Sequence, residues 1–197
     1  MKLRVTPGVL VPRPETELLV EEAVAVSRER KAQYVVDVGT GCGAIAIQLA
    51  RSLPYAKVTG IDVSREALKV ARYNAESTCT SDRTEWLEGD LLGPVTSEPD
   101  LVVANLPYLS ESMMSDIGPD VRHEPPLALY GGTTGLELYR ALFEQRRGRG
   151  WSMPILVEID ARQSVHLSTM LREVFAETDV RVRQDYAGLD RIVVVGA

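Results

Sequence analysis

Short, continuously apolar runs alternate along the chain with longer stretches in which apolar residues recur every three or four positions. The apolar runs predict strands of a parallel sheet buried on both faces, and the longer stretches predict amphipathic helices that cover it. The predicted strands are 34–38, 57–62, 84–88, 101–104 and 154–159. The predicted helices are 44–51, 65–75, 136–145 and 163–174. The pattern is typical of one α/β domain.

The two ends of the pattern differ from its centre. Residues 179–183 and 191–195 form two β-rich runs separated by a turn at Gly188. Because a parallel return needs a long crossover, this short connection favours an antiparallel pair at the end of the sheet. Before the first strand, residues 17–30 predict an extra amphipathic helix, introduced by Pro12-Arg13-Pro14.

Composition places the chain among ordinary globular proteins. Its 197 residues, 45% hydrophobic and 25% charged, suit a single domain with a sizeable core. The longest apolar runs, such as 192–195, are too short to span a bilayer, and the N-terminus lacks a signal-peptide pattern. Two cysteines, Cys42 and Cys79, provide neither a disulfide framework nor metal-ligand spacing. We therefore expect a cytoplasmic protein without a metal site, in which His123 and His166 are surface or packing residues.

The formal net charge is -6. A protein that binds nucleic acid through its phosphates needs a basic face, so this balance disfavours a nucleic-acid partner without excluding one. Basic residues cluster at Arg146-Arg147-Gly148-Arg149, which we interpret as a solvated loop after a helix.

A glycine-rich loop, Asp37-Val38-Gly39-Thr40-Gly41-Cys42-Gly43, joins the first strand to the first helix. Glycines permit a tight turn and a close approach of backbone to ligand, and the helix N-terminus presents free N–H groups. With Ala44 in the last position the loop matches the relaxed dinucleotide fingerprint. Taken alone, it fits NAD, another adenosine cofactor or a purely structural turn.

Acidic residues at three strand ends narrow this choice. Asp62 follows Asp37 by 25 residues, where a carboxylate can accept hydrogen bonds from ribose hydroxyls. Asp90 ends the third strand. Individually, Asp62 can be a helix N-cap shared with Ser64, and Asp90 a surface turn. Together around one glycine loop, the three acids favour an adenosyl ligand at the carboxyl edge of the sheet.

The tetrapeptide Asn105-Leu106-Pro107-Tyr108 follows the fourth strand, where α/β domains place their chemistry. It can be a simple turn, but its groups suit a planar nitrogen whose lone pair is delocalised. The side-chain oxygen of Asn105 and the carbonyl of Leu106 can accept bonds from one NH2 group, and Tyr108 can offer a stacking face. No His or Cys is placed as a general base, so the proton leaves to solvent or to the Asn oxygen.

With these residues in view, the chain resembles the PrmC/HemK family, which methylates the glutamine of the Gly-Gly-Gln motif in peptide chain release factors. The resemblance covers nearly the whole chain. It is carried by the glycine loop extended to Ala46, by the tetrapeptide, and by 11–17, 124–129, Gly131-Gly132, Gly135-Leu136 and 185–191. The Pro-Arg-Pro-Glu-Thr-Glu stretch with the later Glu-Pro and Gly-Gly elements is more specific than the glycine loop.

The resemblance implies a class I SAM-dependent methyltransferase (Rossmann-like): a seven-stranded, mostly parallel sheet with helices on both faces and an antiparallel terminal strand. Residues 31–197 would form the methyltransferase domain, and 1–30 an N-terminal segment and helix packed on it. S-adenosyl-L-methionine would be the cofactor, S-adenosyl-L-homocysteine its product, and a release factor the protein partner. The implied cofactor residues are Gly39, Thr40, Gly41, Cys42, Gly43, Asp62, Val63, Asp90, Leu91 and Asn105. The implied catalytic residues are Asn105, Pro107 and Tyr108. The implied substrate residues are Arg13, Pro14, Glu15, Thr16, Leu106, Glu124 and Pro125.

Departures from the family pattern qualify this expectation. Leu106 stands where the family usually has proline, which keeps the carbonyl but reduces the rigidity of the backbone. Thr134 replaces a common acidic residue, and Asp160 a common glycine. Family members usually begin with a helical docking domain, whereas this chain starts just before Pro12, so we expect a catalytic core without that domain.

Other functions stay open. Asn-Leu-Pro-Tyr also resembles the tetrapeptide of ribosomal RNA adenine dimethylases, so an adenine-N6 methyltransferase acting on RNA or DNA is the nearest alternative. The acidic chain and the lack of a basic helical domain after the sheet disfavour it. A non-catalytic adenosyl-cofactor-binding module would keep the glycine loop but has no need of Asn105. An oxidoreductase would need a nicotinamide site, which nothing in the sequence marks.

Overall fold

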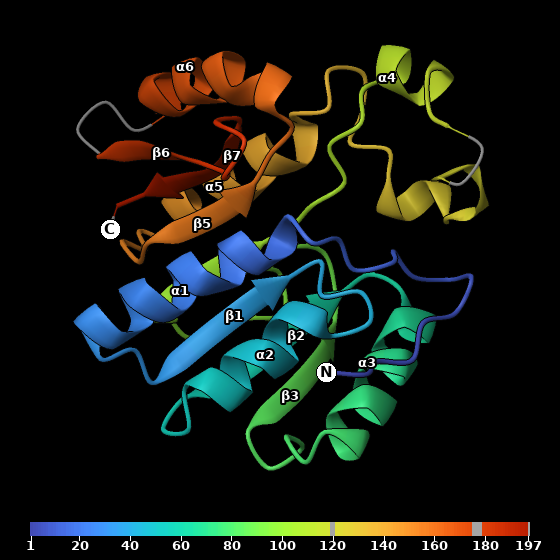
Figure 1. The fold of residues 1–197 in the computed structure, drawn as a ribbon. Helices are drawn as coiled ribbons and strands as arrows, with labels where there is room; N and C mark the ends of the chain where they lie inside the picture. The colour runs from blue at the N-terminus through green and yellow to red at the C-terminus, as the bar shows by residue number, and fades with distance from the viewer. Residues whose placement is uncertain (119–120, 175–178, 197) are drawn as a thin grey trace.

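A seven-stranded sheet forms the centre of the molecule (Figure 1), as seen in a computed structural model that describes residues 1–118, 121–174 and 179–196. The strand order is β3-β2-β1-β4-β5-β7-β6. The strands are β1 (Tyr34–Val38), β2 (Lys57–Asp62), β3 (Thr84–Glu88), β4 (Leu101–Ala104), β5 (Ile155–Glu158), β6 (Val180–Gln184) and β7 (Asp190–Val195). Strands β1 to β5 are parallel, and β7 runs antiparallel to both of its neighbours. The predicted sheet with an antiparallel terminal strand is therefore confirmed.

Helices pack on both faces of this sheet (Figure 1). The α-helices are α1 (Thr16–Arg30), α2 (Ala44–Ser52), α3 (Arg65–Ser77), α4 (Glu111–Ser115), α5 (Glu137–Gly148) and α6 (Ser164–Val174). The 3-10 turns are η1 (Val121–His123), η2 (Pro126–Ala128) and η3 (Ala161–Gln163). Alternate residues of β1 show the two faces: Val35 packs with α1 and α2, whereas Val36 packs with α5 and α6. Because both faces are covered at the centre of the sheet, the central strands β1, β4 and β5 are buried and mostly apolar.

Helix starts follow local hydrogen-bonding signals. Ser64 caps α3, its side chain accepting a hydrogen bond from the Ala67 N–H at 3.2 Å, as the sequence predicted. The Glu137 carboxylate accepts bonds from the backbone N–H groups of Thr134 and Leu136 at 2.9 and 3.0 Å, which supports the start of α5. The predicted helix bounds agree with the observed ones or differ by up to three residues, and the short elements α4, η1 and η2 were not predicted.

The basic cluster 146–149 was predicted to be a solvated loop, and this is confirmed only in part: residues 147–149 are exposed, but residues 146–148 belong to the last turn of α5. Arg146 lies in the last turn of α5, is buried, and donates to the Ser152 carbonyl at 2.8 Å. Arg149 donates to the carbonyls of Leu92 and Gly93 and lies over the Trp151 ring at 4.5 Å. These arginines join α5 to neighbouring loops, so the cluster is a structural feature. Among the described residues, the structure contains no helix of the length and apolarity needed to cross a bilayer.

Candidate active site

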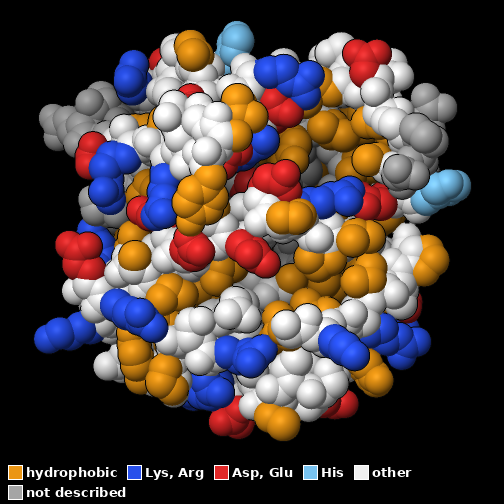
Figure 2. Space-filling model, viewed as in Figure 1, with side chains coloured by type: hydrophobic (Ala, Val, Ile, Leu, Met, Phe, Trp, Pro, Cys, Tyr) orange, Lys and Arg blue, Asp and Glu red, His pale blue; other side chains and the backbone are white. Residues whose placement is uncertain are grey.

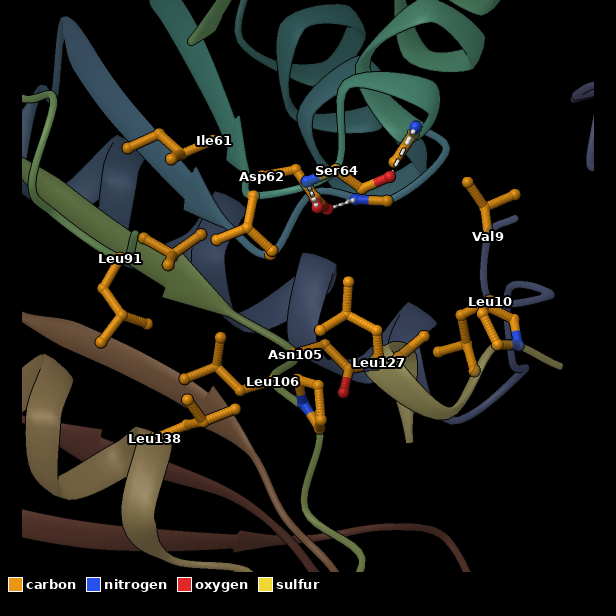
Figure 3. A pocket seen from close by; sticks show the side chains of 18 of the residues that line it. Val9, Leu10, Ile61, Asp62, Ser64, Leu91, Asn105, Leu106, Leu127 and Leu138 are labelled. Carbon is orange, nitrogen blue, oxygen red and sulfur yellow. Dashed lines mark hydrogen bonds between the residues drawn. The ribbon is translucent and has the colours of Figure 1, made fainter. Parts of the chain in front are cut away.

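A cavity lies at the carboxyl ends of β1, β2 and β4 (Figure 3). Asp62 and Asn105 lie on opposite sides of it, at the ends of β2 and β4. Leu91 and Leu138 close one end, and the N-terminal residues Val9 and Leu10 close the other. Figure 2 shows a hollow with hydrophobic side chains inside it on the face of the molecule seen in Figure 1. This first cavity is therefore mainly apolar, with an acid on one wall and an amide on the other.

The glycine loop forms one wall of the first cavity, and its conformation requires glycine. Gly39, Gly41 and Gly43 have φ values of 73°, 55° and 83°, in the left-handed region that side chains disfavour. At Gly41, a Cβ atom would meet no protein atom within 4 Å. Because Gly41 lines the cavity, such a Cβ would use space that a ligand can occupy.

Asp62 fastens this loop to the end of β2. Its Oδ2 accepts a hydrogen bond from the Gly41 N–H at 2.9 Å, and its Oδ1 accepts one from the Ser64 N–H at 2.8 Å (Figure 3). Burial raises the pKa of the Asp62 carboxyl, and these backbone bonds counteract the rise. A carboxylate offers about four lone-pair positions, so Asp62 retains capacity for a ligand hydroxyl.

Asp37 has a different role from the one its strand-end position suggested. It is fully buried and does not line the cavity. Its Oδ2 accepts bonds from the Thr40 hydroxyl at 2.6 Å and from the Ala46 N–H at 3.1 Å, whereas Oδ1 has no partner among the described residues. Burial raises the pKa of Asp37 to about 7. Asp37 therefore holds the loop from beneath and does not face a ligand.

The turn after β3 contributes the third acid. Asp90 is exposed and lines the cavity beside Leu91. Leu91 has a φ of 48°, a left-handed conformation that is uncommon for a residue with a branched side chain. Strained backbone of this kind is often found at ligand sites. Here it places the Leu91 side chain against the apolar part of the cavity.

A second cavity lies on the other side of the tetrapeptide. Asn105, Leu106 and Pro107 line both cavities, and Tyr108 lines only the second. Burial raises the pKa of the Tyr108 phenol to about 12, so it stays neutral and suits a stacking role. The tetrapeptide therefore separates two compartments that both reach Asn105.

Two glycines and a glutamine hold the tetrapeptide in place. A Cβ at Gly131 would lie 2.3 Å from the Pro107 carbonyl oxygen, and one at Gly135 would lie 2.2 Å from the Tyr108 carbonyl oxygen. The Gln163 Nε2 donates to the same Tyr108 oxygen at 2.8 Å. Only glycine permits this close approach, which explains why both glycines accompany the tetrapeptide.

The N-terminal segment reaches the second cavity through an ion pair. Arg13 lines this cavity and donates from Nη2 to both carboxylate oxygens of Glu124, at 2.6 and 2.8 Å. The Glu124 side chain is only 8% exposed. Charge-assisted bonds to one carboxylate fix its orientation, so this pair ties the segment before α1 to the segment that carries η1 and η2.

Asn105 has two polar neighbours behind it. Its Nδ2 donates to the Thr16 hydroxyl at 3.1 Å, at the first residue of α1. Glu158, the last residue of β5, lines the second cavity and is 3% exposed. Burial raises the pKa of Glu158, whereas the hydrogen bond with Thr16, the charge of Arg191 and the hydrogen bond with Asn105 lower it.

Comparisons with known proteins agree on the class of this site. A sequence model described as "Methyltransferase small domain" matches residues 14–120. The release factor glutamine methyltransferase of Moorella thermoacetica is 39% identical over 97% of this chain and 68% of its own length. The enzyme of the same name from Gloeobacter violaceus is 38% identical over 100% of this chain and 70% of its own. The chain belongs to the release factor glutamine methyltransferase family. It is therefore a methyltransferase, as the resemblance predicted.

Solved structures add support for the fold. The ribosomal protein L11 methylase of Lactobacillus delbrueckii subsp. bulgaricus has a TM-score of 0.67 at 21% identity, covering 98% of this chain and 83% of its own. The N-terminal domain of human METTL16 in complex with SAH has a TM-score of 0.68 at 14% identity, covering 98% and 75%. At these identities the likeness concerns the fold, which is that of class I methyltransferases.

The predicted site residues of this family member line the first cavity, the second cavity or neither. Lining the first cavity are Gly39, Gly41, Asp62, Val63, Asp90, Leu91, Asn105, Leu106, Pro107 and Pro125. Lining the second are Arg13, Asn105, Leu106, Pro107 and Tyr108. Lining neither are Pro14, Glu15, Thr16, Thr40, Cys42, Gly43 and Glu124. Within this last group, Thr16 and Glu124 bond to the site residues Asn105 and Arg13. Thr40 bonds to Asp37 beneath the glycine loop, and Cys42 is buried in a small apolar cluster. The individual roles of these residues stay predictions.

Sequence reasoning missed Glu158 and Gln163. An available signal for Glu158 was an acid at the end of the apolar run 155–157, the same pattern that marked Asp62. Gln163 gave no such signal, because a glutamine at the start of a helix is ordinary. Its role depends on the fold, which brings it to the backbone of Tyr108.

The three departures from the family pattern have local explanations. Leu106 is 3% exposed and belongs to the main core cluster, so packing restrains it where a proline ring would otherwise do so. The Thr134 hydroxyl donates to Glu137 at 3.1 Å before α5. Asp160 caps η3, its side chain accepting from the Arg162 N–H at 2.9 Å.

Proposed function

We propose that this protein transfers a methyl group from S-adenosyl-L-methionine to the side-chain amide nitrogen of the glutamine in the Gly-Gly-Gln motif of a peptide chain release factor. The observation that carries the proposal is the pair of cavities that meet at Asn105. One offers a glycine loop and an acid to a cofactor, and the other offers an amide and a tyrosine to a planar group. The names of the relatives support the choice of substrate.

The first cavity fits an adenosyl cofactor. Gly41 leaves open space where any other residue would place a Cβ, and Asp62 offers acceptor positions for ribose hydroxyls. Leu91 and Leu138 provide apolar surface for the adenine ring. When bound, S-adenosyl-L-methionine supplies an electrophilic methyl group on a sulfonium.

The second cavity suits a glutamine side chain. The Asn105 Oδ1 and the Leu106 carbonyl accept hydrogen bonds from its NH2 group, while Tyr108 stacks on the planar amide. Both acceptors favour the charge distribution in which the nitrogen becomes positive, so they stabilise the transition state more than the ground state. The amide nitrogen would form its new bond to the methyl carbon as the sulfur–carbon bond of the sulfonium breaks. S-adenosyl-L-homocysteine would be the leaving group, and the nitrogen would lose one proton to water.

The remaining predicted residues would guide the protein substrate to this cavity. Arg13 lines it, and Pro14 and Glu15 are exposed at the start of α1. Residues 1–30 are accordingly proposed as an N-terminal entry segment and helix that pack on the core and contribute to both cavities, and residues 31–197 as the methyltransferase domain.

A mass measurement tests this function. Purified release factor and, separately, RNA are incubated with the protein and S-adenosyl-L-methionine. A gain of one methyl group on the Gly-Gly-Gln glutamine is expected, and a release factor with Gln replaced by Glu is the matched control that must stay unmodified. Methylated adenine would instead support the RNA or DNA alternative. Cofactor binding without any transfer would favour a non-catalytic module.

A further inference from the structure

We propose that Thr16 and Glu158 are positioning residues that hold the amide group of Asn105 with its carbonyl oxygen toward the substrate. This inference rests on the proposed function and deepens it. Three elements meet here that are distant in sequence: the start of α1, the end of β4 and the end of β5. Neither Thr16 nor Glu158 is required to touch the methyl group, because both act through Asn105.

The hydrogen-bond geometry directs the side-chain nitrogen of Asn105 toward Thr16. Its Nδ2 donates to the Thr16 Oγ1 at 3.1 Å. Thr16 is 8% exposed and Glu158 is 3% exposed, so water does not compete freely for these bonds. Glu158 lines the second cavity together with Asn105, and hydrogen bonding by the Thr16 and Asn105 side chains lowers its pKa.

The chemistry of the three groups fixes the direction of these bonds. An ionised carboxylate can only accept, so a Thr16 hydroxyl that turns its hydrogen toward Glu158 has only its lone pairs left for Asn105, which matches the bond from Asn105 Nδ2 to Thr16 Oγ1. The NH2 end of Asn105 therefore belongs at Thr16. A flipped amide would set its oxygen against two acceptors, which is unfavourable in a buried setting.

This fixed direction matters for methyl transfer. With its nitrogen held by Thr16, Asn105 presents Oδ1 as an acceptor for the substrate NH2 group. A flipped Asn105 would present a second NH2 group instead, and two donors would face each other. The orientation of the Asn105 amide thus decides whether the site binds or repels the NH2 group of the substrate.

The stability of the fold does not explain why an acidic side chain is buried at position 158. Burial raises its pKa, which marks the cost of charging it there. Its Oε2 has no hydrogen-bond partner in the part of the chain that the structure describes. The Tyr139 hydroxyl fixes the Glu158 backbone carbonyl at 2.5 Å, so the carboxylate cannot easily withdraw. Buried acids with unmet bonding capacity are uncommon and call for a functional reason.

Variants at Thr16 give a matched test. Thr16→Val removes the hydroxyl at constant shape, Thr16→Ser keeps it, and Thr59→Val removes a buried hydroxyl on β2 that lines neither cavity. We expect kcat of Thr16→Val to fall about tenfold or more, while calorimetric affinity for S-adenosyl-L-methionine is retained. Thr16→Ser should recover most of the lost turnover. Equal kcat in Thr16→Val and Thr59→Val would overturn the proposal.

Glu158→Gln tests the direction of the hydrogen bonds among Glu158, Thr16 and Asn105. Glutamine has nearly the same shape, but its amide can donate as well as accept, so it no longer dictates the orientation of Asn105. We expect a reduced kcat with an unchanged melting temperature. Wild-type kcat in this variant would contradict the role of Glu158.

A spectroscopic readout separates this inference from the proposed function. The chain contains only two asparagines, Asn74 and Asn105, so selective nitrogen-15 labelling gives two side-chain amide signals. Asn74 is buried and donates to the Arg4 and Cys42 carbonyls, which makes it an internal reference. The Asn105 amide protons should exchange slowly in the wild type and in Thr16→Ser, and faster in Thr16→Val and Glu158→Gln. Unaltered exchange would refute the positioning role, whatever substrate the enzyme methylates.

Discussion

The Asp62 carboxylate accepts a hydrogen bond from the Gly41 N–H at 2.9 Å, so the end of β2 holds the glycine loop that follows β1. The same carboxylate faces the first cavity. One side chain thus shapes the loop and offers acceptors to a ligand. Loss of the Asp62 side chain should therefore affect both the conformation of the glycine loop and the binding of a ligand.

Asp62→Ala should weaken the binding of S-adenosyl-L-methionine by about tenfold or more, because it removes acceptors for the ligand and for the loop. Isothermal titration calorimetry measures the change. Asp82→Ala is the control, since Asp82 is exposed and pairs only with its neighbour Arg83 among the described contacts. Unchanged affinity in Asp62→Ala would remove Asp62 from the cofactor site.

Asn105→Ala should retain cofactor affinity and lose methyl transfer by about a hundredfold or more, because it deletes an acceptor aimed at the developing charge. Single-turnover transfer to a release factor, followed by mass, measures the loss. If turnover matched that of the wild type, Asn105 would have no part in the mechanism.

Gly131→Ala should disturb the site, because its Cβ would lie 2.3 Å from the Pro107 carbonyl oxygen. We expect a loss of about 1–3 kcal/mol in the free energy of unfolding, as for other overpacked positions, together with reduced transfer. Gly148→Ala is the matched control, because a Cβ there meets nothing within 4 Å. Denaturant unfolding compares the two variants, and equal stability would contradict the packing assigned to Gly131.

The pKa of Asp37 predicts a dependence of stability on pH. Burial raises this pKa to about 7, well above the ordinary value of about 3.8 for an aspartate. The folded state therefore holds the proton more tightly, so its contribution is complete below about pH 4 and is lost as the pH rises to about 7. The unfolding free energy of the wild type should fall relative to Asp37→Asn by about 1 kcal/mol per pH unit in this window. A constant difference between pH 5 and 7 would show that Asp37 does not titrate there.

Much of the fold could be predicted because its physical signals are local. The run Tyr34–Val38 is apolar except for Asp37, since both faces of β1 are covered, and Ser64 caps a helix through its immediate neighbours. The acid Asp62 was found at the cavity by the same local logic.

The remaining features depend on contacts that the sequence pattern does not record. Asp37 was grouped with the ligand-facing acids, but its side chain turns beneath the loop to Thr40. Arg149 was interpreted as solvated, because its carbonyl partners lie more than fifty residues away in sequence. The sequence does not reveal that Glu158 and Thr16 are neighbours of Asn105, because this depends on the packing of α1 and β5 beside β4.

The position of β7 has a consequence for the order in which the molecule is assembled. This strand lies between β5 and β6, although it follows both in the chain. During synthesis, β5 lacks its second neighbour, and β6 its only partner strand, until residues 190–195 have left the ribosome. Glu158 is paired with Ile192 across that late junction. The part of the sheet that carries Glu158 and borders the second cavity is therefore completed last, after the glycine loop and its neighbouring strands are already available to fold.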